Sequence, residues 1–333
     1  MGRYRTIYTE NQNGDGYEAE KNKTEKLRLR RKLIAVVSCM LIIGIAVQSR
    51  FAVKAVKRMV REQAETALVD KTEAVADMLD KETTAFFQYA EVLAHSPVLN
   101  DRSIPNSKKA KIVYEQVAFN DAIRGIVFCD MDGHGFINSG ERVSALNEEW
   151  FRAAASGKHF VSEPTVFSSI NTVSFIFAVP IRMGGKITGV LSMIVSSDFF
   201  SKKIESITVG HTGYSSVLGS TGIIIADRDQ HFVENKYNII SEAAEDESLA
   251  SFKVFIETAL AGQTGVGYYT FMDLPCMAAY TTMQTTGWTV VLNAPELELT
   301  GAAKKFTSMV VVTSVLFLVA AITIAGAAIR KII

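Results

Sequence analysis

This sequence of 333 residues has few cysteines, no net charge and no residue spacing typical of a metal site. Its three cysteines, Cys39, Cys129 and Cys276, are far apart, and no C-x-x-C pair or Cys/His ligand spacing occurs. This pattern excludes a disulfide framework and a zinc-finger type of site. Lysine and arginine number 35, as do aspartate and glutamate, so the net charge of zero gives no indication of nucleic-acid binding.

Enzyme motifs are missing as well. The sequence has no G-x-S-x-G, H-E-x-x-H, Walker or Rossmann pattern. The glycine-rich stretch 262–267 precedes a predicted strand and therefore offers no helix N-terminus to a phosphate. The five histidines are isolated from one another: His95, His134, His159, His211 and His231. We predict no catalytic residue, no cofactor and no metal site.

One stretch resembles a calcium-binding loop only formally. Asp130, Asp132, His134 and Glu141 occupy the spacing of an EF-hand loop. Such a loop follows a helix, however, whereas residues 125–129 form an apolar β-like run, and imidazole is a poor calcium ligand. We interpret Asp130–Gly133 as a hairpin turn.

Two apolar segments frame the chain. Residues 306–329 contain no charge over 24 residues, which is about 36 Å of helix and long enough to cross a bilayer. Residues 33–47 are shorter, and cross only if Lys32 and Arg50 snorkel or if the helix continues past Arg50. A cleaved signal peptide is the alternative interpretation, although the 32-residue lead-in is long for one. We predict an uncleaved transmembrane helix over 33–49 and a second over 306–329.

Basic residues favour a cytoplasmic location for both termini. Seven Lys or Arg residues lie within 21–32, and Arg330 and Lys331 follow the second segment. Five further basic residues between Arg50 and Arg61 oppose this assignment. The polar composition of residues 1–32 predicts a disordered cytoplasmic tail.

The segment between the apolar helices begins with a long predicted stalk helix, 50–97. Apolar residues recur every three or four positions from Val53 to Leu93, and no proline interrupts them before Pro97. At about 45 residues this helix is about 65–70 Å long, more than one small domain buries.

An internal repeat follows the stalk. Residues 126–137 and 216–226 both have the pattern of strand, glycine turn and strand. Predicted helices follow at 147–155 and 242–261. Further predicted strands are 173–181 and 187–195 in the first copy and 267–272, 277–282 and 289–294 in the second. The fold class is therefore α+β, with tandem antiparallel modules at 98–208 and 209–305.

The chain resembles the double-Cache sensor domain of bacterial chemoreceptors and sensor kinases over residues 50 to about 300. The stretches that carry the resemblance, in chain order, are Asn147–Phe151, Val161–Thr165, Ala178–Ile181, Gly185–Val190, Gly210–Tyr214, Ser220–Ala226, Gly262–Val266, Gly287–Trp288 and Ala294–Glu298. The resemblance implies two PAS-like modules on a long helix, a homodimer, and a ligand pocket in the module farther from the membrane.

The resemblance also implies which ligands are excluded. Members that bind amino acids carry an arginine two residues before the tryptophan, where this chain has Glu148. They also carry Tyr or Asp residues after Ser-Glu-Pro and an Asp on a later strand, where this chain has Thr165–Ser168 and Ile194. Arginine and carboxylate groups are what an amino acid requires. We therefore expect a small-molecule ligand other than a typical amino acid.

The pocket expected in the first module is mostly apolar. Its candidate ligand-binding residues are Trp150, Phe151, Phe167, Ser168, Ser174, Phe175, Ser192 and Ile194. The alternative, that these side chains fill the module core and leave no cavity, stays open.

The resulting hypothesis is a multi-pass sensory receptor of the inner cell membrane, with its sensor domain outside the cytoplasm. Chemotaxis through a methyl-accepting output region is the favoured function. The sensing half of a histidine kinase or diguanylate cyclase, or a membrane binding protein without output, are the alternatives. Residues 330–333 start a cytoplasmic segment, so we expect the output region in a continuation of the chain or in a separate partner.

Overall fold

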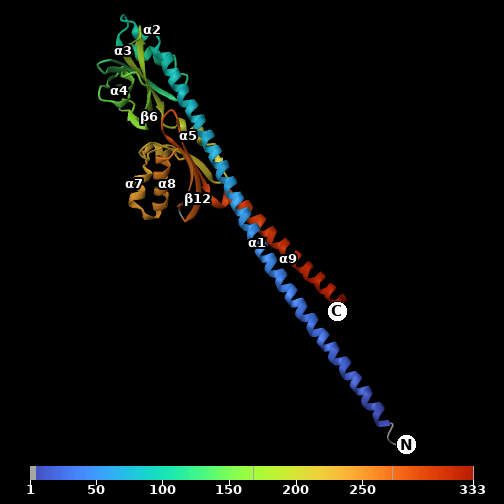
Figure 1. Ribbon diagram of the computed structural model, residues 1–333. Coiled ribbons are helices and arrows are strands. Elements are labelled where there is room, and N and C mark those ends of the chain that lie inside the picture. The colour runs from blue at the N-terminus through green and yellow to red at the C-terminus, as the bar shows by residue number, and fades with distance from the viewer. Residues whose placement is uncertain (1–4, 168, 272, 333) are drawn as a thin grey trace. The chain divides into compact units, whose positions relative to one another are not determined.

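The computed structural model of the protein describes residues 5–167, 169–271 and 273–332 (Figure 1). Two compact units make up the chain, residues 63–299 and the combined terminal segments up to 62 and from 300. The longest element, helix α1 (Arg5–Ala94), has 90 residues. It includes residues 5–32, for which composition predicts disorder. No proline interrupts this stretch, and residues 17–32 are rich in Glu, Lys, Leu and Arg, which favour helix.

Helix α1 ends where the sequence predicts. Pro97 restricts the backbone of the residue before it and cannot continue the hydrogen-bond ladder, so the helix stops at Ala94. Two short helices follow, α2 (Pro97–Asn100) and α3 (Asn106–Glu115). The apolar stripe of the stalk is buried in the compact unit at Leu68, Val75, Leu79, Phe86, Ala90 and Leu93.

The first sheet has seven antiparallel strands. They are β1 (Ile123–Asp130), β2 (His134–Ile137), β3 (Arg142–Ser144), β4 (Phe160–Val161), β5 (Thr165–Phe167), β6 (Thr172–Met183) and β7 (Lys186–Ser196). The order is β3-β2-β1-β7-β6-β4, with β5 also paired to β6. Helix α4 (Glu149–Ala155) contacts β6 and β7, and α5 (Phe199–Ile204) leads to the second sheet.

The second sheet has six antiparallel strands. They are β8 (Thr208–Val209), β9 (Gly213–Leu218), β10 (Ile224–Ala226), β11 (Thr264–Phe271), β12 (Leu274–Thr282) and β13 (Thr289–Pro295). The order is β10-β9-β13-β12-β11, with β8 paired to β9. The order of the main strands repeats that of β2-β1-β7-β6-β5 in the first sheet. Each module therefore starts from a hairpin and places its last strand beside the first strand of that hairpin.

The second module carries more helix than the first. Helices α6 (Gln230–Glu234), α7 (Ile239–Glu245) and α8 (Ala250–Ala261) follow β10, with a 3₁₀ turn at Glu247–Leu249 (Figure 1). The sequence predicts one helix over 242–261, but Asp246 breaks it. The backbone of Asp246 is extended and its carboxylate accepts a hydrogen bond from the Ser248 N–H, which starts a new turn.

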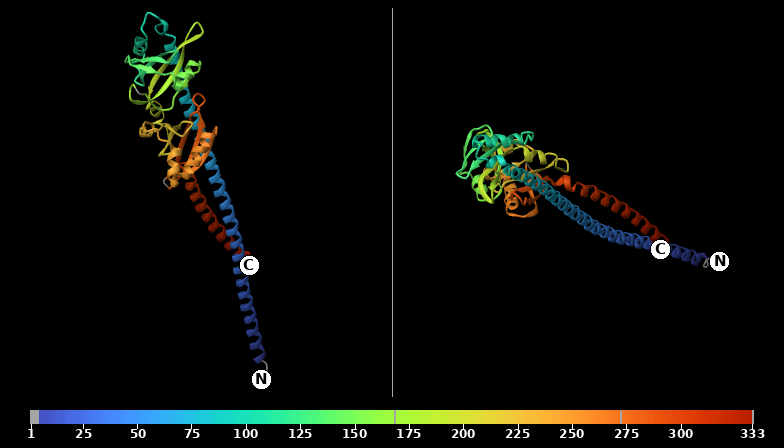
Figure 2. Two further views of the ribbon diagram at one scale, coloured as in Figure 1. Left: turned by 90° about the vertical axis from the view of Figure 1, so that its left-hand side faces the viewer. Right: turned by 90° about the horizontal axis from the view of Figure 1, so that it is seen from above.

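Both sheets pack one face against the stalk and cover the other with their own helices. Phe177 of β6 lies between Phe86 and Phe87 of α1, with ring centroids 5.2 and 5.3 Å away. Met277 of β12 and Leu292 of β13 are buried in one cluster with Leu68. The Asp80 carboxylate accepts hydrogen bonds from the N–H groups of residues 284 and 285, at 2.8 and 2.9 Å, in the β12–β13 turn. Figure 2 shows both sheets following this part of α1. The prediction of a mixed fold with antiparallel sheets and a long N-terminal helix is confirmed.

The terminal segments form a separate unit. Helix α9 (Glu296–Ile332) follows β13 directly, and it and α1 are both long and apolar enough to cross a membrane, by length and composition. Within this unit the two helices are in contact, since the Ser49 hydroxyl donates to the Ser314 hydroxyl at 2.8 Å.

Candidate functional site

The aromatic residues predicted as a pocket in the first module lie on the sheet face away from the stalk. Trp150 and Phe151 of α4, Phe167 of β5 and Ile194 of β7 belong to one buried cluster. Their exposed fractions run from 0 to 8%, and none of them lines the cavity described below. In this structure these four side chains pack as a core.

Phe175 does not belong to this group, which corrects the sequence prediction. Successive side chains of a strand point to opposite faces, so Phe175 of β6 points away from its neighbours Ser174 and Ile176. It packs against Phe200 and Trp288, with ring centroids 4.9 and 5.8 Å away. Phe175 therefore belongs to the core between the two modules.

The predicted serines have different surroundings. Ser174 is fully buried, and its hydroxyl is 3.3 Å from that of Thr172. The Ser192 hydroxyl is buried and has no hydrogen-bond partner in the described part of the chain. Ser168 lies outside the described residues. A buried hydroxyl without a partner costs free energy, which distinguishes Ser192 from Ser174.

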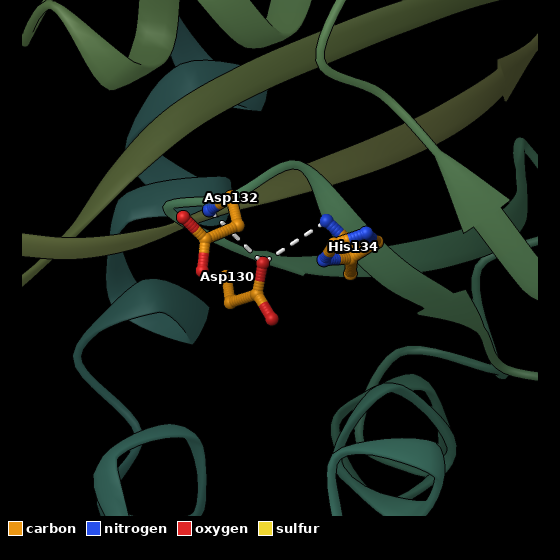
Figure 3. A group of neighbouring side chains, drawn as sticks. All are labelled: Asp130, Asp132 and His134. Carbon is orange, nitrogen blue, oxygen red and sulfur yellow. Dashed lines mark hydrogen bonds between the residues drawn. The ribbon is translucent and has the colours of Figure 1, made fainter.

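The loop that resembles a calcium site is a hairpin turn between β1 and β2. Ligand atoms of Asp130, Asp132 and His134 lie within 4.8 Å of one another. Asp130 Oδ1 accepts hydrogen bonds from the N–H of Asp132 at 3.1 Å and of His134 at 2.9 Å (Figure 3). Gly133 has φ +77°, a conformation that favours glycine, and the segment enters from a strand rather than a helix. These turn contacts account for the Asp-x-Asp-Gly spacing.

A cavity of about 320 Å³ lies in the second module, between the sheet and helices α6–α8. Leu218, Tyr269 and Val291 line it from β9, β11 and β13, and Phe232, Phe252 and Ile256 line it from the helices. Phe252 and Tyr269 pack against each other in this wall, with ring centroids 4.7 Å apart. Its volume is at the lower end of the range for small-molecule sites.

Polar groups gather at one part of the cavity wall. Asp227 follows β10 and is 4% exposed. Its carboxylate accepts hydrogen bonds from the Ser216 hydroxyl at 2.5 Å and from the Asp229 N–H at 3.0 Å. Burial raises the pKa of the Asp227 carboxyl, an effect that these hydrogen bonds and the Arg228 charge oppose. Arg228 is exposed, and its guanidinium lies 4.1 Å from the ring centroid of Tyr214, another wall residue.

Sequence reasoning placed the pocket in the first module and missed this cavity. The available signal was the acidic residue Asp227 directly after the apolar strand 224–226, in a segment rich in aromatic residues. We interpreted those residues only as strands and core, because no local pattern shows which strand faces enclose empty space.

The comparison with protein families decides what kind of domain this is. The family model described as a Cache domain matches residues 56–303, about three quarters of the chain. The chain belongs to the Cache domain family. No curated protein sequence matches it.

Solved structures similar to this Cache chain are sensory domains. The ligand-binding domain of Pseudomonas fluorescens chemoreceptor CtaA, in complex with L-isoleucine, has 15% identity and a TM-score of 0.59, covering 74% of this chain and 98% of that one. The Campylobacter jejuni chemoreceptor Tlp3 sensory domain has 14% identity and a TM-score of 0.55, covering 74% and 99%. The extracellular domain of the histidine kinase mmHK1S-Z2 has 15% identity and a TM-score of 0.54, covering 72% and 99%. These similarities confirm the Cache fold.

The Cache cavity is tied to the start of α9 by one carboxylate. Glu298 accepts hydrogen bonds from the N–H groups of His211 and Thr212, at 2.6 and 3.0 Å, and from the Thr212 hydroxyl at 2.7 Å. These bonds lower the pKa of Glu298. Thr212 and Pro295 both line the cavity. The cavity wall is therefore hydrogen-bonded to the first turn of α9.

Proposed function

We propose that this chain is the sensing part of a transmembrane receptor that binds a small extracellular ligand. The observation that carries the proposal is the cavity of the second module, whose wall strand β13 continues directly into the apolar helix α9. If this wall has two conformations, a ligand that binds one of them more tightly shifts the equilibrium toward it. The size of the shift is set by the difference between the ligand's affinities for the two conformations. The change at the start of α9 is then an axial or rotational shift of about 1–2 Å.

The proposal places residues 33–49 of α1 and residues 306–329 of α9 in the inner cell membrane, and the Cache modules outside the cytoplasm. Both helices are long and apolar enough, and the contact between Ser49 and Ser314 agrees with two antiparallel spans. Basic residues flank the outer ends of both apolar segments, which favours cytoplasmic termini. We further propose a homodimer, in which stalk helices of two copies associate.

Chemotaxis is the output that we propose first, through a methyl-accepting region. A histidine kinase is the second candidate, because structures of both classes share this fold. Mass spectrometry of the receptor from its native membrane distinguishes them. Methylated glutamates in the chain's continuation or a bound partner support chemotaxis, and a phosphorylated histidine supports a kinase.

Ligand binding itself is tested by thermal unfolding of the 333-residue chain in detergent, followed by tryptophan fluorescence. The panel includes amino acids, amines, organic acids, purines, sugars and small apolar compounds. A ligand at about 100 times its Kd stabilises by about 2.7 kcal/mol, or roughly 5–10 °C for a domain of this size. If no compound of the panel raises the unfolding temperature, the result contradicts the proposed function. A stabilisation that Ser192→Ala abolishes assigns the site to the first module instead.

Replacing Glu298 with alanine is expected to uncouple the cavity from α9 while leaving ligand affinity within about twofold. The three hydrogen bonds from residues 211 and 212 lose their acceptor. Hydrogen exchange then quickens at the amides of His211 and Thr212, and ligand no longer slows exchange at residues 296–299. Glu298→Gln, which keeps one acceptor oxygen, serves as the intermediate control. Unchanged exchange at both amides in Glu298→Ala contradicts this role.

A further inference from the structure

We propose that the cavity of the second module binds a small primary amine, with its ammonium group on the Asp227 carboxylate and its apolar body against the aromatic wall. This inference rests on the proposed ligand-sensing function and adds the site and the chemical class. It departs from the sequence expectation, which placed the pocket in the first module.

The first argument is the charge of the wall. Asp227 is the buried charged side chain among the residues that line the cavity, and it is 4% exposed. The part of the chain that the structure describes gives it no ion pair; its partners are the Ser216 hydroxyl and the Asp229 N–H. A buried carboxylate without a counter-ion is costly, and a ligand cation removes most of that cost.

The second argument concerns Arg228, the nearest residue that might neutralise Asp227. Arg228 is exposed, and its guanidinium stacks on the Tyr214 ring at 4.1 Å. Arg228 thus lines the cavity through its stacking on Tyr214, and among the described residues it forms no ion pair with the Asp227 carboxylate. This contact also shows that an aromatic face of the wall accepts a positive charge.

The third argument is the shape of the apolar part. The rings of Phe232 and Tyr237 lie 5.0 Å apart, and Phe252 lies 4.7 Å from Tyr269. The cavity of about 320 Å³ that these residues help to line suits a compact hydrocarbon or aromatic group.

Arg228, the cation among the lining residues, is exposed and stacks on Tyr214. The buried part of the wall therefore presents the Asp227 carboxylate among aromatic rings, which favours an amine over a sugar or a purely apolar compound.

The test uses 2-phenylethylamine and 3-methylbutylamine as probes on the full chain in detergent. Their neutral and anionic counterparts, 2-phenylethanol and phenylacetate, serve as ligand controls, together with the zwitterion phenylalanine. We expect saturating amine to raise the Tm by about 5–10 °C and the controls to leave it nearly unchanged.

The matched variants are Asp227→Asn and Asp229→Asn. Asparagine keeps the shape at residue 227 and retains an acceptor for the Asp229 N–H, so the fold is preserved. Removing the charge is expected to weaken amine binding about 10- to 100-fold. Asp229 is exposed and caps α6 through the His231 N–H, a bond that asparagine also makes, so Asp229→Asn keeps wild-type affinity.

The pH dependence gives a second readout. Amine binding needs the carboxylate form of Asp227, so affinity falls as the pH falls through the pKa of this carboxyl, which burial raises. Among the described residues, the other titratable or charged groups at the cavity or beside Asp227 are Arg228, Asp229, Tyr214, Tyr237, Tyr269 and Cys276. Burial raises the pKa of Tyr237, so this phenol stays neutral in the acidic range. Burial raises the pKa of Tyr214, Tyr269 and Cys276, so none of these three ionises in the acidic range. Asp227→Asn is expected to abolish the acid-side loss of affinity.

The outcomes separate this inference from the function on which it rests. Absence of stabilisation by both amines overturns the inference, and so does an amine effect that Asp227→Asn leaves intact. Stronger stabilisation by phenylalanine than by 2-phenylethylamine overturns the amine class, because Arg228 then holds a carboxylate. In each case the proposed ligand-sensing function stands if another compound of the panel binds. If no compound binds, both the proposed function and this inference are overturned.

Discussion

Replacing Trp288 with alanine is expected to lower the free energy of unfolding by about 3–5 kcal/mol. The indole is 4% exposed. It packs against Phe175 of the first sheet and Phe200 of α5, with ring centroids 5.8 and 5.4 Å away. Because it joins the cores of the two modules, its loss leaves a cavity between them. Urea unfolding of the full chain in detergent, followed by circular dichroism, measures the change.

The matched control for Trp288 is Phe119→Ala. The Phe119 side chain is 79% exposed, so its removal is expected to change stability by less than about 0.5 kcal/mol. If Trp288→Ala lowers the free energy of unfolding by no more than Phe119→Ala does, the predicted stabilisation by the aromatic contact between the modules is wrong. Separate unfolding transitions for the two modules in Trp288→Ala indicate that the indole also maintains their cooperativity.

Replacing Gly213 with alanine is expected to destabilise the second module by about 3 kcal/mol or more. A Cβ atom there lies 2.4 Å from the Val209 carbonyl oxygen, and 2.5 Å from both the Asn293 carbonyl oxygen and the Ala294 Cβ. These neighbours belong to the strands on either side of β9, so relief of the clash requires the sheet to open. Because residues 212 and 214 line the cavity, ligand affinity is expected to fall as well.

Gly301→Ala provides the control for Gly213→Ala. Gly301 lies in α9, and no atom outside its own helix lies within 4 Å of the added Cβ. Alanine favours helix over glycine by about 0.5–1 kcal/mol, so this variant is expected to be slightly more stable. If the Gly213→Ala and Gly301→Ala variants unfold at the same temperature, the predicted clash at Gly213 is wrong.

The periodicity of the sequence was sufficient to predict the main elements. Apolar residues at helical spacing before Pro97 predicted the stalk, and glycine turns between apolar runs predicted both hairpins. Strands β3, β4 and β5, with two to three residues each, were missed because so few residues carry no periodic signal. The break at Asp246 was missed because an extended backbone inside a helical pattern depends on local capping.

The candidate site was predicted less well, and Phe175 and Asp227 show why. Strand periodicity predicts that Phe175 and Ser174 point to opposite faces of the sheet. Which face each residue occupies depends on the pairing of β6 with β7 and on the packing of Phe175 against Phe200 and Trp288. Asp227 carries no motif, and only the fold shows that it is buried beside a cavity.

The sequence by itself determined the Cache family, the stalk, the two apolar helices and the α+β class, because each depends on periodicity, composition or motif order along the chain. Only the tertiary structure showed the cavity of the second module. The residues around Trp150 and Ile194 pack together, whereas the wall of Asp227, Tyr269 and Phe252 encloses a cavity. Whether a cavity forms depends on how completely side chains from distant segments fill the space between them, and no local pattern in a sequence encodes this packing.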